Sequence, residues 1–315
     1  MLRVAIPGVQ GALAKATAPR NPKVGELYME SFARAGVING VAPILILLLV
    51  GAPAAAQNPK AKNNLLENVA LCNGSDRTSP EPQIIGCTGV IDSVGPRAPA
   101  AAMAYNNRGD AYTAKGDYDR AVQDFDQSIK LNPTNAKPFN NRGLAYLKKG
   151  EYDLAIKNLE EAIRLEPNYA KAFTNRAETY EKKHAYDLAA RDYDEAIRLE
   201  PNLKAAWNGR CWTRAILGDL QAALEDCNKA LQSEPADAAT FDSRGLTYMK
   251  MGQFDTAIDD YNSALRLDPK LASALYGRGL AKRKKGDKVG SDADMSAAKK
   301  IHAKIGDDFA RYGVQ

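Results

Sequence analysis

The chain has 315 residues, which is enough for one large domain or two ordinary ones. Hydrophobic residues make up 45% of it and charged residues 26%, a composition typical of a soluble globular protein. The net charge is +5, but five basic and only two acidic residues precede Gln57, so the rest of the chain is nearly neutral. This balance argues against binding to nucleic acid or anionic lipid through bulk charge, and we expect no nucleic-acid partner.

Residues 41–56, VAPILILLLVGAPAAA, have the pattern of an export signal. Arg34 precedes an apolar run over residues 43–50, and small residues follow it up to Ala56, where cleavage would leave Gln57 as the new N-terminus. The run is shorter than the ~20 residues that a membrane-spanning helix needs. We therefore expect an exported protein, located in the periplasm or outside the cell.

The expected start of this signal is Met29, because a signal that began at residue 1 would be too long. We predict a signal peptide over residues 29–56 and interpret residues 1–28 as a mis-called start or a disordered stretch. The alternative is an uncleaved anchor over residues 41–56, with the rest of the chain outside the cytoplasm. A membrane partner is implied only by this alternative.

Two short helical segments follow within residues 57–101. The first, NNLLENVALC, places Leu65 and Cys72 near one helical face. The second, TSPEPQIIGCTGVI, opens with Thr78 three residues before Glu81, which is the spacing of a capping box. We predict a divergent N-terminal helical hairpin and a linker in this region.

From residue 102 onward the chain repeats itself every 34 residues: NRGDAYTAKGDYDRAVQDFDQSIKLNP at 107–133 returns as NRGLAYLKKGEYDLAIKNLEEAIRLEP at 141–167. Position 4 of the repeat is bulky, positions 8 and 20 are small, and positions 15 and 32 are usually glycine and proline. Positions 4, 8 and 11 share a face of one helix, and positions 20, 24 and 27 share a face of a second. Each unit is therefore predicted to be a helical hairpin that stacks on its neighbours. The units within 102–305 are 102–135, 136–169, 170–203, 204–237, 238–271 and 272–305.

These units resemble tetratricopeptide repeats (TPRs), whose period and W/F–G–Y–A–F–A–P pattern they follow. The resemblance implies an all-α fold. We expect a right-handed α-solenoid (superhelix) of six TPR helix-turn-helix units, with the N-terminal helical hairpin before them. A C-terminal capping helix over residues 306–315 would follow them, with Ile305 and Phe309 turned inward. The chain resembles in particular exported bacterial envelope and periplasmic proteins that carry these repeats.

The four cysteines are predicted to form two disulfides. Cys211 and Cys227 occupy positions 8 and 24 of the fourth unit, which face each other across the hairpin, and facing thiols in an oxidising compartment should bond. Two buried free thiols are the alternative. Cys72 and Cys87 would tie the N-terminal hairpin together. No C-x-x-C spacing suggests a redox site, and with two histidines in the chain we expect no metal and no cofactor.

In the TPR family, several positions of the first helices line a concave groove that binds peptides. By this resemblance the groove here would take an extended segment with some acidic character, although the lysines could serve only to complement helix C-termini. Trp212 is the candidate anchor, and packing against a neighbouring unit is its alternative role. The candidate groove residues are Asn106, Asn140, Leu144, Lys148, Lys182, Asn208, Trp212, Leu246 and Lys250.

Position 7 is arginine in every unit, where the family usually has leucine, and position 23 is acidic in all units but one. We interpret these residues as a structural ladder of ion pairs that fixes the stacking. A row of arginines that faces a ligand is the alternative. The ladder consists of Arg108, Arg142, Arg176, Arg210, Arg244 and Arg278 with Asp124, Asp192, Asp226, Asp260 and Asp294.

The sequence contains no serine–histidine–acid set, phosphate-binding glycine loop or metal-ligand cluster that would support catalysis. We therefore expect a non-catalytic scaffold of the bacterial cell envelope that binds a protein or peptide segment in the groove of its repeats. One alternative is a regulatory or substrate-recruiting subunit of an envelope enzyme. Another is a membrane-tethered structural protein.

Overall fold

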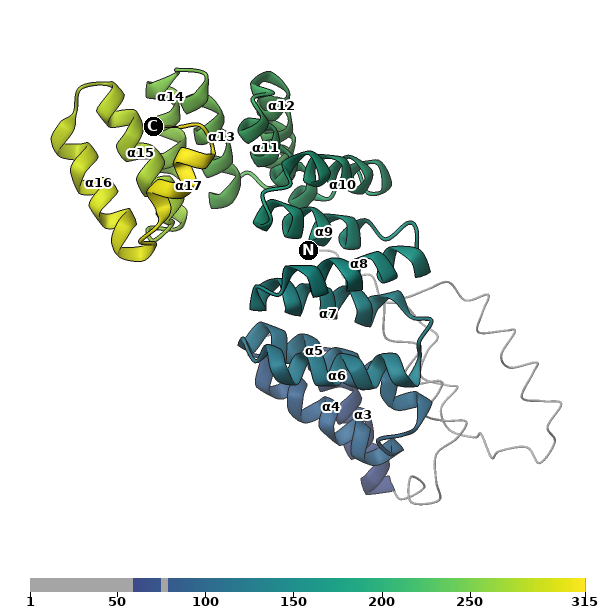
Figure 1. The fold of residues 1–315 in the computed structure, drawn as a ribbon. Helices are drawn as coiled ribbons and strands as arrows, with labels where there is room; N and C mark the ends of the chain where they lie inside the picture. The colour runs from purple at the N-terminus through teal and green to yellow at the C-terminus, as the bar shows by residue number, and fades with distance from the viewer. Residues whose placement is uncertain (1–58, 75–78, 315) are drawn as a thin grey trace, which may run out of the picture.

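The computed structural model describes residues 59–74 and 79–314 (Figure 1). The predicted signal peptide over 29–56 and the segment 1–28 lie outside these residues. In the described part every regular element is helical, and none of its helices is both long and apolar enough to span a bilayer. The elements are α3 (Pro59–Cys72), α4 (Pro80–Val94), η2 (Pro99–Ala101), α5 (Ala102–Lys115), α6 (Tyr118–Leu131), α7 (Ala136–Lys149), α8 (Tyr152–Leu165), α9 (Ala170–Lys182), α10 (Tyr186–Leu199), α11 (Lys204–Leu217), α12 (Leu220–Ser233), α13 (Ala238–Lys250), α14 (Phe254–Leu267), α15 (Ala272–Lys284), α16 (Lys288–Ile301) and α17 (Ile305–Arg311).

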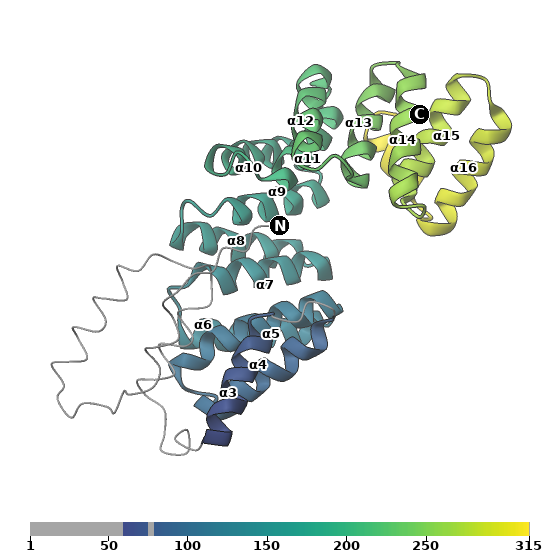
Figure 2. The ribbon, with the colours of Figure 1, turned by 180° about the vertical axis from the view of Figure 1, so that it is seen from behind.

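Helical pairs stack one after another from α5–α6 to α15–α16, following the α3–α4 hairpin. Within each pair the two helices pack together, and each first helix also contacts the first helix of the next pair. The helices α5, α7, α9, α11, α13 and α15 therefore form one continuous layer, whose exposed surface we call the first-helix face. Figures 1 and 2 show the stack curving as a superhelix from the blue α3–α4 hairpin to the yellow α16. The predicted all-α solenoid is confirmed.

Small residues on the first helices explain why the two helices of a pair pack so closely. A Cβ atom at Gly109 would lie 2.6 Å from the ring of Phe125, and one at Gly143 would lie 2.7 Å from Leu159. Phe125 and Leu159 are completely buried on the second helices. The glycine thus admits a bulky partner that fills the space between two close backbones.

A left-handed residue ends the first helix in most units. Gly116 and Gly150 both have φ of 81° and bond back to the last turn of the helix that they end. In the third unit His184 takes this place with φ of 60°, the only positive φ outside glycine among the described residues. The turn requires this conformation, and His184 is exposed to solvent there.

Two disulfides each join the helices of one hairpin. The bond between Cys72 and Cys87 joins α3 to α4 with Cα atoms 4.4 Å apart, and the bond between Cys211 and Cys227 joins α11 to α12 with Cα atoms 5.3 Å apart. Both distances lie in the range that a disulfide requires. Because such bonds persist in oxidising compartments, they are compatible with an exported protein.

Candidate functional site

The position-7 arginines bind carboxylates within their own units in every unit but the second. For Arg176, the Nε and Nη2 atoms donate to the two carboxylate oxygens of Asp192 at 2.7 and 2.8 Å. In the first five units the guanidinium also lies over the aromatic ring at position 4, as Arg210 does at 4.8 Å from the Trp207 ring centroid. The bidentate pairs are Arg108–Asp124, Arg176–Asp192, Arg210–Asp226, Arg244–Asp260 and Arg278–Asp294.

Some position-7 arginines also donate a hydrogen bond to a carboxylate of the preceding unit. The Nη1 atom of Arg210 donates to Asp194 of α10 at 2.6 Å. Arg142 differs in its own unit, where it donates to the amide oxygen of Asn158 at 2.7 Å, and its carboxylate partner is Asp126 of the preceding unit. Since their donors and faces are occupied by the scaffold, these arginines are poorly placed to bind a ligand. The geometry supports the structural interpretation of the ladder.

The electrostatic balance differs along the ladder: at the first rung burial raises the pKa of Asp124 despite Arg108, whereas at the last rung the cations prevail. Burial opposes ionisation of Asp294, but the hydrogen bonds and charges of Arg278 and Lys282 outweigh burial and lower its pKa. The carboxylate is therefore held in its charged form between two cations.

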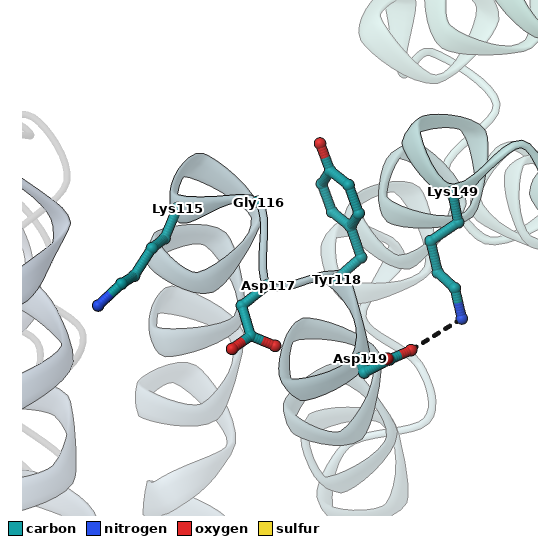
Figure 3. Close-up of a pocket in the computed structure, with 6 residues that line it drawn as sticks. All are labelled: Lys115, Gly116, Asp117, Tyr118, Asp119 and Lys149. Carbon is teal, nitrogen blue, oxygen red and sulfur yellow. Dashed lines mark hydrogen bonds and ion pairs between the residues drawn. The ribbon is translucent and has the colours of Figure 1, made fainter.

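A shallow hollow of about 380 Å³ lies beside the turn between α5 and α6 (Figure 3). Lys149 of the next unit reaches into it and lies 2.8 Å from Asp119, whereas Lys115 points away and pairs with Glu81 at 2.9 Å. Such exposed ion pairs contribute little individually to stability. The hollow is thus a product of the repeat, and equivalent pairs join Lys183 to Asp153 and Lys285 to Asp255.

Asparagines at positions 5 and 6 of the first two units and at position 6 of the third form a chain of side-chain hydrogen bonds across the first-helix face. The Nδ2 atom of Asn141 donates to Oδ1 of Asn106 at 3.1 Å, and that of Asn175 donates to Oδ1 of Asn140 at 2.9 Å. Asn107 continues the chain to a backbone carbonyl of α3 at 3.2 Å. We call Asn106, Asn107, Asn140, Asn141 and Asn175 the amide ladder. Asn106 and Asn140 also donate to the side-chain oxygens of Asn107 and Asn141 and are buried. The partly exposed Asn141 and Asn175 each keep one N–H donor that these bonds do not use.

The amide ladder borders a groove of about 540 Å³ over α5, α7 and α9, which we call the open groove. Asp110, Leu144 and Glu178, which occupy position 9 of three successive units, also line it. Tyr169, just before α9, contributes an aromatic ring, and the volume is in the range of ligand-binding clefts. The open groove therefore combines amides, apolar surface, two acids and the two lysines Lys137 and Lys171.

The two acids of the open groove have different surroundings. Burial raises the pKa of Glu178, while the positive charges of Lys148 and Lys182 oppose this rise. Crowding by the groove walls also raises the pKa of Asp110, with no charged neighbour contributing, although the side chain stays accessible to water. In the part of the chain that the structure describes, Asp110 has no ion-pair partner.

Residues 305–314, which we call the C-terminal segment, turn back over the first-helix face of the last units (Figure 1, yellow). Phe309 packs on Tyr276 of α15 with ring centroids 4.9 Å apart, and Tyr312 packs edge-on against Trp212 of α11 at 5.3 Å. Phe309 is 1% exposed, and Leu246 of α13, in the same core, is completely buried. The segment thus covers this face from α15 back to α11.

Lys250 fixes the end of the C-terminal segment. Its Nζ atom donates to the carbonyl oxygen of Ile216 in α11 at 3.0 Å and to that of Tyr312 at 2.9 Å. Burial lowers the pKa of Lys250. A cation between two helix C-termini is favourably placed with respect to both helix dipoles.

The groove expected from the sequence is therefore divided into two chemically different parts. Asn106, Asn140 and Leu144 line the open groove, and Lys148 and Lys182 flank its second acid. Asn208 lies at the boundary between the two parts, and its Oδ1 atom is buried without a hydrogen-bond partner.

The other three candidates lie differently from what the sequence predicts. Trp212, Leu246 and Lys250 contact or lie beneath the C-terminal segment and do not line an open surface. The physical reason is the aromatic content of the segment, which buries itself on the apolar first-helix residues of the last three units. Leu246 is a core residue, and Trp212 and Lys250 are partly buried by their contacts with the segment. The expectation of a single groove with Trp212 as an exposed anchor is therefore corrected.

The position-6 residues line the groove or mark its end, and their role is not predicted from the sequence. Asparagine at this position continues the amide ladder, whereas Gly209 and Gly277 take its place in the fourth and sixth units. A Cβ atom at Gly209 would lie 2.2 Å from the ring of Tyr193, so this glycine gives its space to a neighbouring core side chain. The change from asparagine to glycine is visible in the sequence and marks where the amide ladder ends.

Models of the tetratricopeptide repeat match residues 109–150, 136–169, 182–238 and 245–286. The chain belongs to the tetratricopeptide repeat (TPR) family. This fold is generally a protein-interaction scaffold without catalysis. No curated protein matches the chain in sequence.

Solved structures with this fold share little sequence with this TPR protein. A tetratricopeptide repeat protein from Parabacteroides merdae is 17% identical, with a TM-score of 0.61 over 81% of this chain and 99% of that one. The Cut9–Hcn1 hetero-tetramer of APC/C is 17% identical, with a TM-score of 0.63 over 92% of this chain and 58% of that one. The pilF protein of Pseudomonas aeruginosa is 15% identical, with a TM-score of 0.55 over 66% of this chain and 96% of that one. At these identities the similarity concerns the fold alone.

Proposed function

We propose that this TPR protein is a non-catalytic scaffold of the bacterial cell envelope that binds an extended segment of a partner protein in the open groove. The amide ladder carries this proposal. An extended segment presents an N–H donor and a C=O acceptor at nearly every residue, and side-chain amides can pair with both. Asn107, Asn141 and Asn175, which are partly exposed in three successive units, offer such partners along the path of the segment.

The envelope location is supported by two independent features. The sequence at 41–56 has the pattern of an export signal, and both cysteine pairs are bonded. On this proposal residues 29–56 are removed, the hairpin and linker at 57–101 precede the repeats at 102–305, and residues 306–315 follow them. N-terminal sequencing of the exported protein tests the cleavage. A mature chain that keeps residues 29–56 would favour a membrane-tethered protein instead.

Site-specific photocrosslinking in intact cells tests the binding surface. A benzoylphenylalanine at Leu144, in the open groove, should crosslink to a partner protein that mass spectrometry can identify. The matched control is the same photoreactive residue at Leu154 of α8, which is 42% exposed on a second helix. Asn141→Ala should weaken the crosslink from Leu144. Identical products from both positions would contradict a role for the groove.

A further inference from the structure

Asp110 is the one acid of the open groove that the protein leaves without a countercharge. It lies on α5, at the end of the groove nearest the α3–α4 hairpin, and lines the same space as Leu144 of α7 and Glu178 of α9. Lys148 and Lys182 act on the charge of Glu178, but no cation does so for Asp110 among the described residues. A carboxylate without a nearby cation is free to pair with one that a ligand brings, and partial exclusion of water by the groove walls strengthens such a pair.

The surroundings of Asp110 are suited to a cationic group. Burial raises the pKa of Tyr169 to about 12, and the negative charge of Asp110 contributes to this rise, so the two side chains are electrostatic neighbours. Asn106 and Asn107 of the amide ladder line the same space. Carboxylate and amide oxygens are acceptors for N–H donors, and a guanidinium or ammonium group carries only donors.

The extent of the open groove limits what can bind there. The C-terminal segment covers the first-helix face from Trp212 of α11 onward, so an occupant is confined to α5, α7, α9 and the start of α11, where Ala205 lines the groove. Neighbouring packed helices lie about 9 Å apart. An extended chain advances about 3.3 Å per residue, so a step from one first helix to the next corresponds to about three residues.

We propose that Asp110 binds the side chain of an arginine or lysine in the partner segment, and that an apolar side chain three residues away packs on Leu144. This rests on the proposed function, because it assumes that an extended segment occupies the open groove. It revises the expectation of an acidic ligand that the lysines alone suggest. The ligand class is a basic–x–x–apolar segment, in either chain direction.

The experiment uses a phage-displayed library of random octapeptides selected on the full protein. Selected peptides should carry arginine or lysine three residues from an apolar residue. For the best peptide, Asp110→Asn should weaken binding about tenfold, equivalent to about 1.4 kcal/mol. Replacing the peptide's arginine, or its lysine counterpart, by neutral citrulline should have the same effect. The two changes together should cost no more than either alone, since both remove one contact.

The control is Asp119→Asn, which removes an exposed carboxylate outside the open groove and should leave the affinity unchanged. Peptides that bind the groove, as judged by loss on Asn141→Ala, but show no basic preference or no coupling to Asp110 would overturn this inference alone. If no selected peptide is sensitive to any substitution in the open groove, both this inference and the proposed function are overturned.

Discussion

Two aspartates of the third and fifth units show that the charge state of a buried carboxylate depends on whether a cation is paired with it. Asp192 receives two hydrogen bonds from Arg176, so its charge is balanced. Asp242 on α13 is only 5% exposed and accepts one bond, from Ser273 at 2.5 Å, while its other oxygen is buried without a partner. A buried carboxylate without a cation favours its protonated form.

We expect Asp242→Asn to stabilise the protein at pH 8 by about 2 kcal/mol and to do so less at acidic pH. Burial raises the pKa of Asp242 to about 7, whereas the unfolded chain has a pKa of about 3.9 at this residue. Between these values the folded state keeps a proton that the unfolded state releases. The parent protein therefore loses stability as the pH rises from about 4 to about 7, and asparagine removes this loss.

Thermal denaturation of both proteins between pH 5 and pH 8 measures this effect. The control is Asp255→Asn, which changes an aspartate that is 78% exposed and should show no such trend. A melting-temperature difference between Asp242→Asn and its parent that is independent of pH would contradict the assignment.

At the scale of the helical element, the position-7 arginine packs the two helices of its unit together, as leucine does in most of the family. It does so through hydrogen bonds and charge, whereas leucine does so through apolar contact. It holds the second helix of its unit through a bidentate pair and, in several units, reaches the preceding second helix as well. Directional bonds of this kind set the angle between elements, whereas an apolar residue only sets their distance. Such an ion pair adds little net stability over an apolar pair, but losing one partner is costly.

This asymmetry predicts the outcome of a substitution cycle in the third unit. Arg176→Leu should lower the free energy of unfolding by about 3 kcal/mol, because it leaves Asp192 buried without its partner. The double variant Arg176→Leu with Asp192→Leu should recover most of that loss. Urea denaturation followed by circular dichroism measures both.

The matched control for this cycle is Arg164→Leu. Arg164 pairs with Glu161 on the surface and is 66% exposed, so its loss should change stability by less than about 0.5 kcal/mol. If Arg176→Leu proves no more destabilising than this control, the ladder has no structural role.

At the scale of the whole molecule, the solenoid could be predicted from the sequence because its contacts are local and repeated. Gly109 packs against Phe125, and the same two repeat positions pack together in the later units. The repeat pattern therefore predicts this contact. The position of the C-terminal segment could not be predicted in this way. The bond from Lys250 to the carbonyl of Tyr312 spans 62 residues and occurs once.

The part of the candidate groove that depends on repeated contacts could be predicted from the sequence, and the part that depends on a non-repeated contact could not. Asn106, Asn140 and Leu144 follow from their repeat positions and lie in the open groove. Trp212 has a matching repeat position, yet a non-repeated residue, Tyr312, covers it. The sequence does hold a hint, since the last ten residues carry Phe309, Tyr312 and Val314, an apolar content that a fully solvated helix would not need.

The C-terminal segment should therefore detach when its main apolar contact is removed, and Trp212 can report this. Trp207, the other tryptophan, occupies a position that holds phenylalanine in three other units, so Trp207→Phe leaves Trp212 as the sole emitter at small cost. In that background Phe309→Ala should shift the emission to longer wavelength and increase quenching by acrylamide, because Phe309 is buried and supports Tyr312 over the indole. Ile301→Ala, at a residue that is 50% exposed at the end of α16, should change neither signal. If emission and quenching stay the same after Phe309→Ala, the segment does not cover Trp212 in solution, and the open groove would extend over all six units.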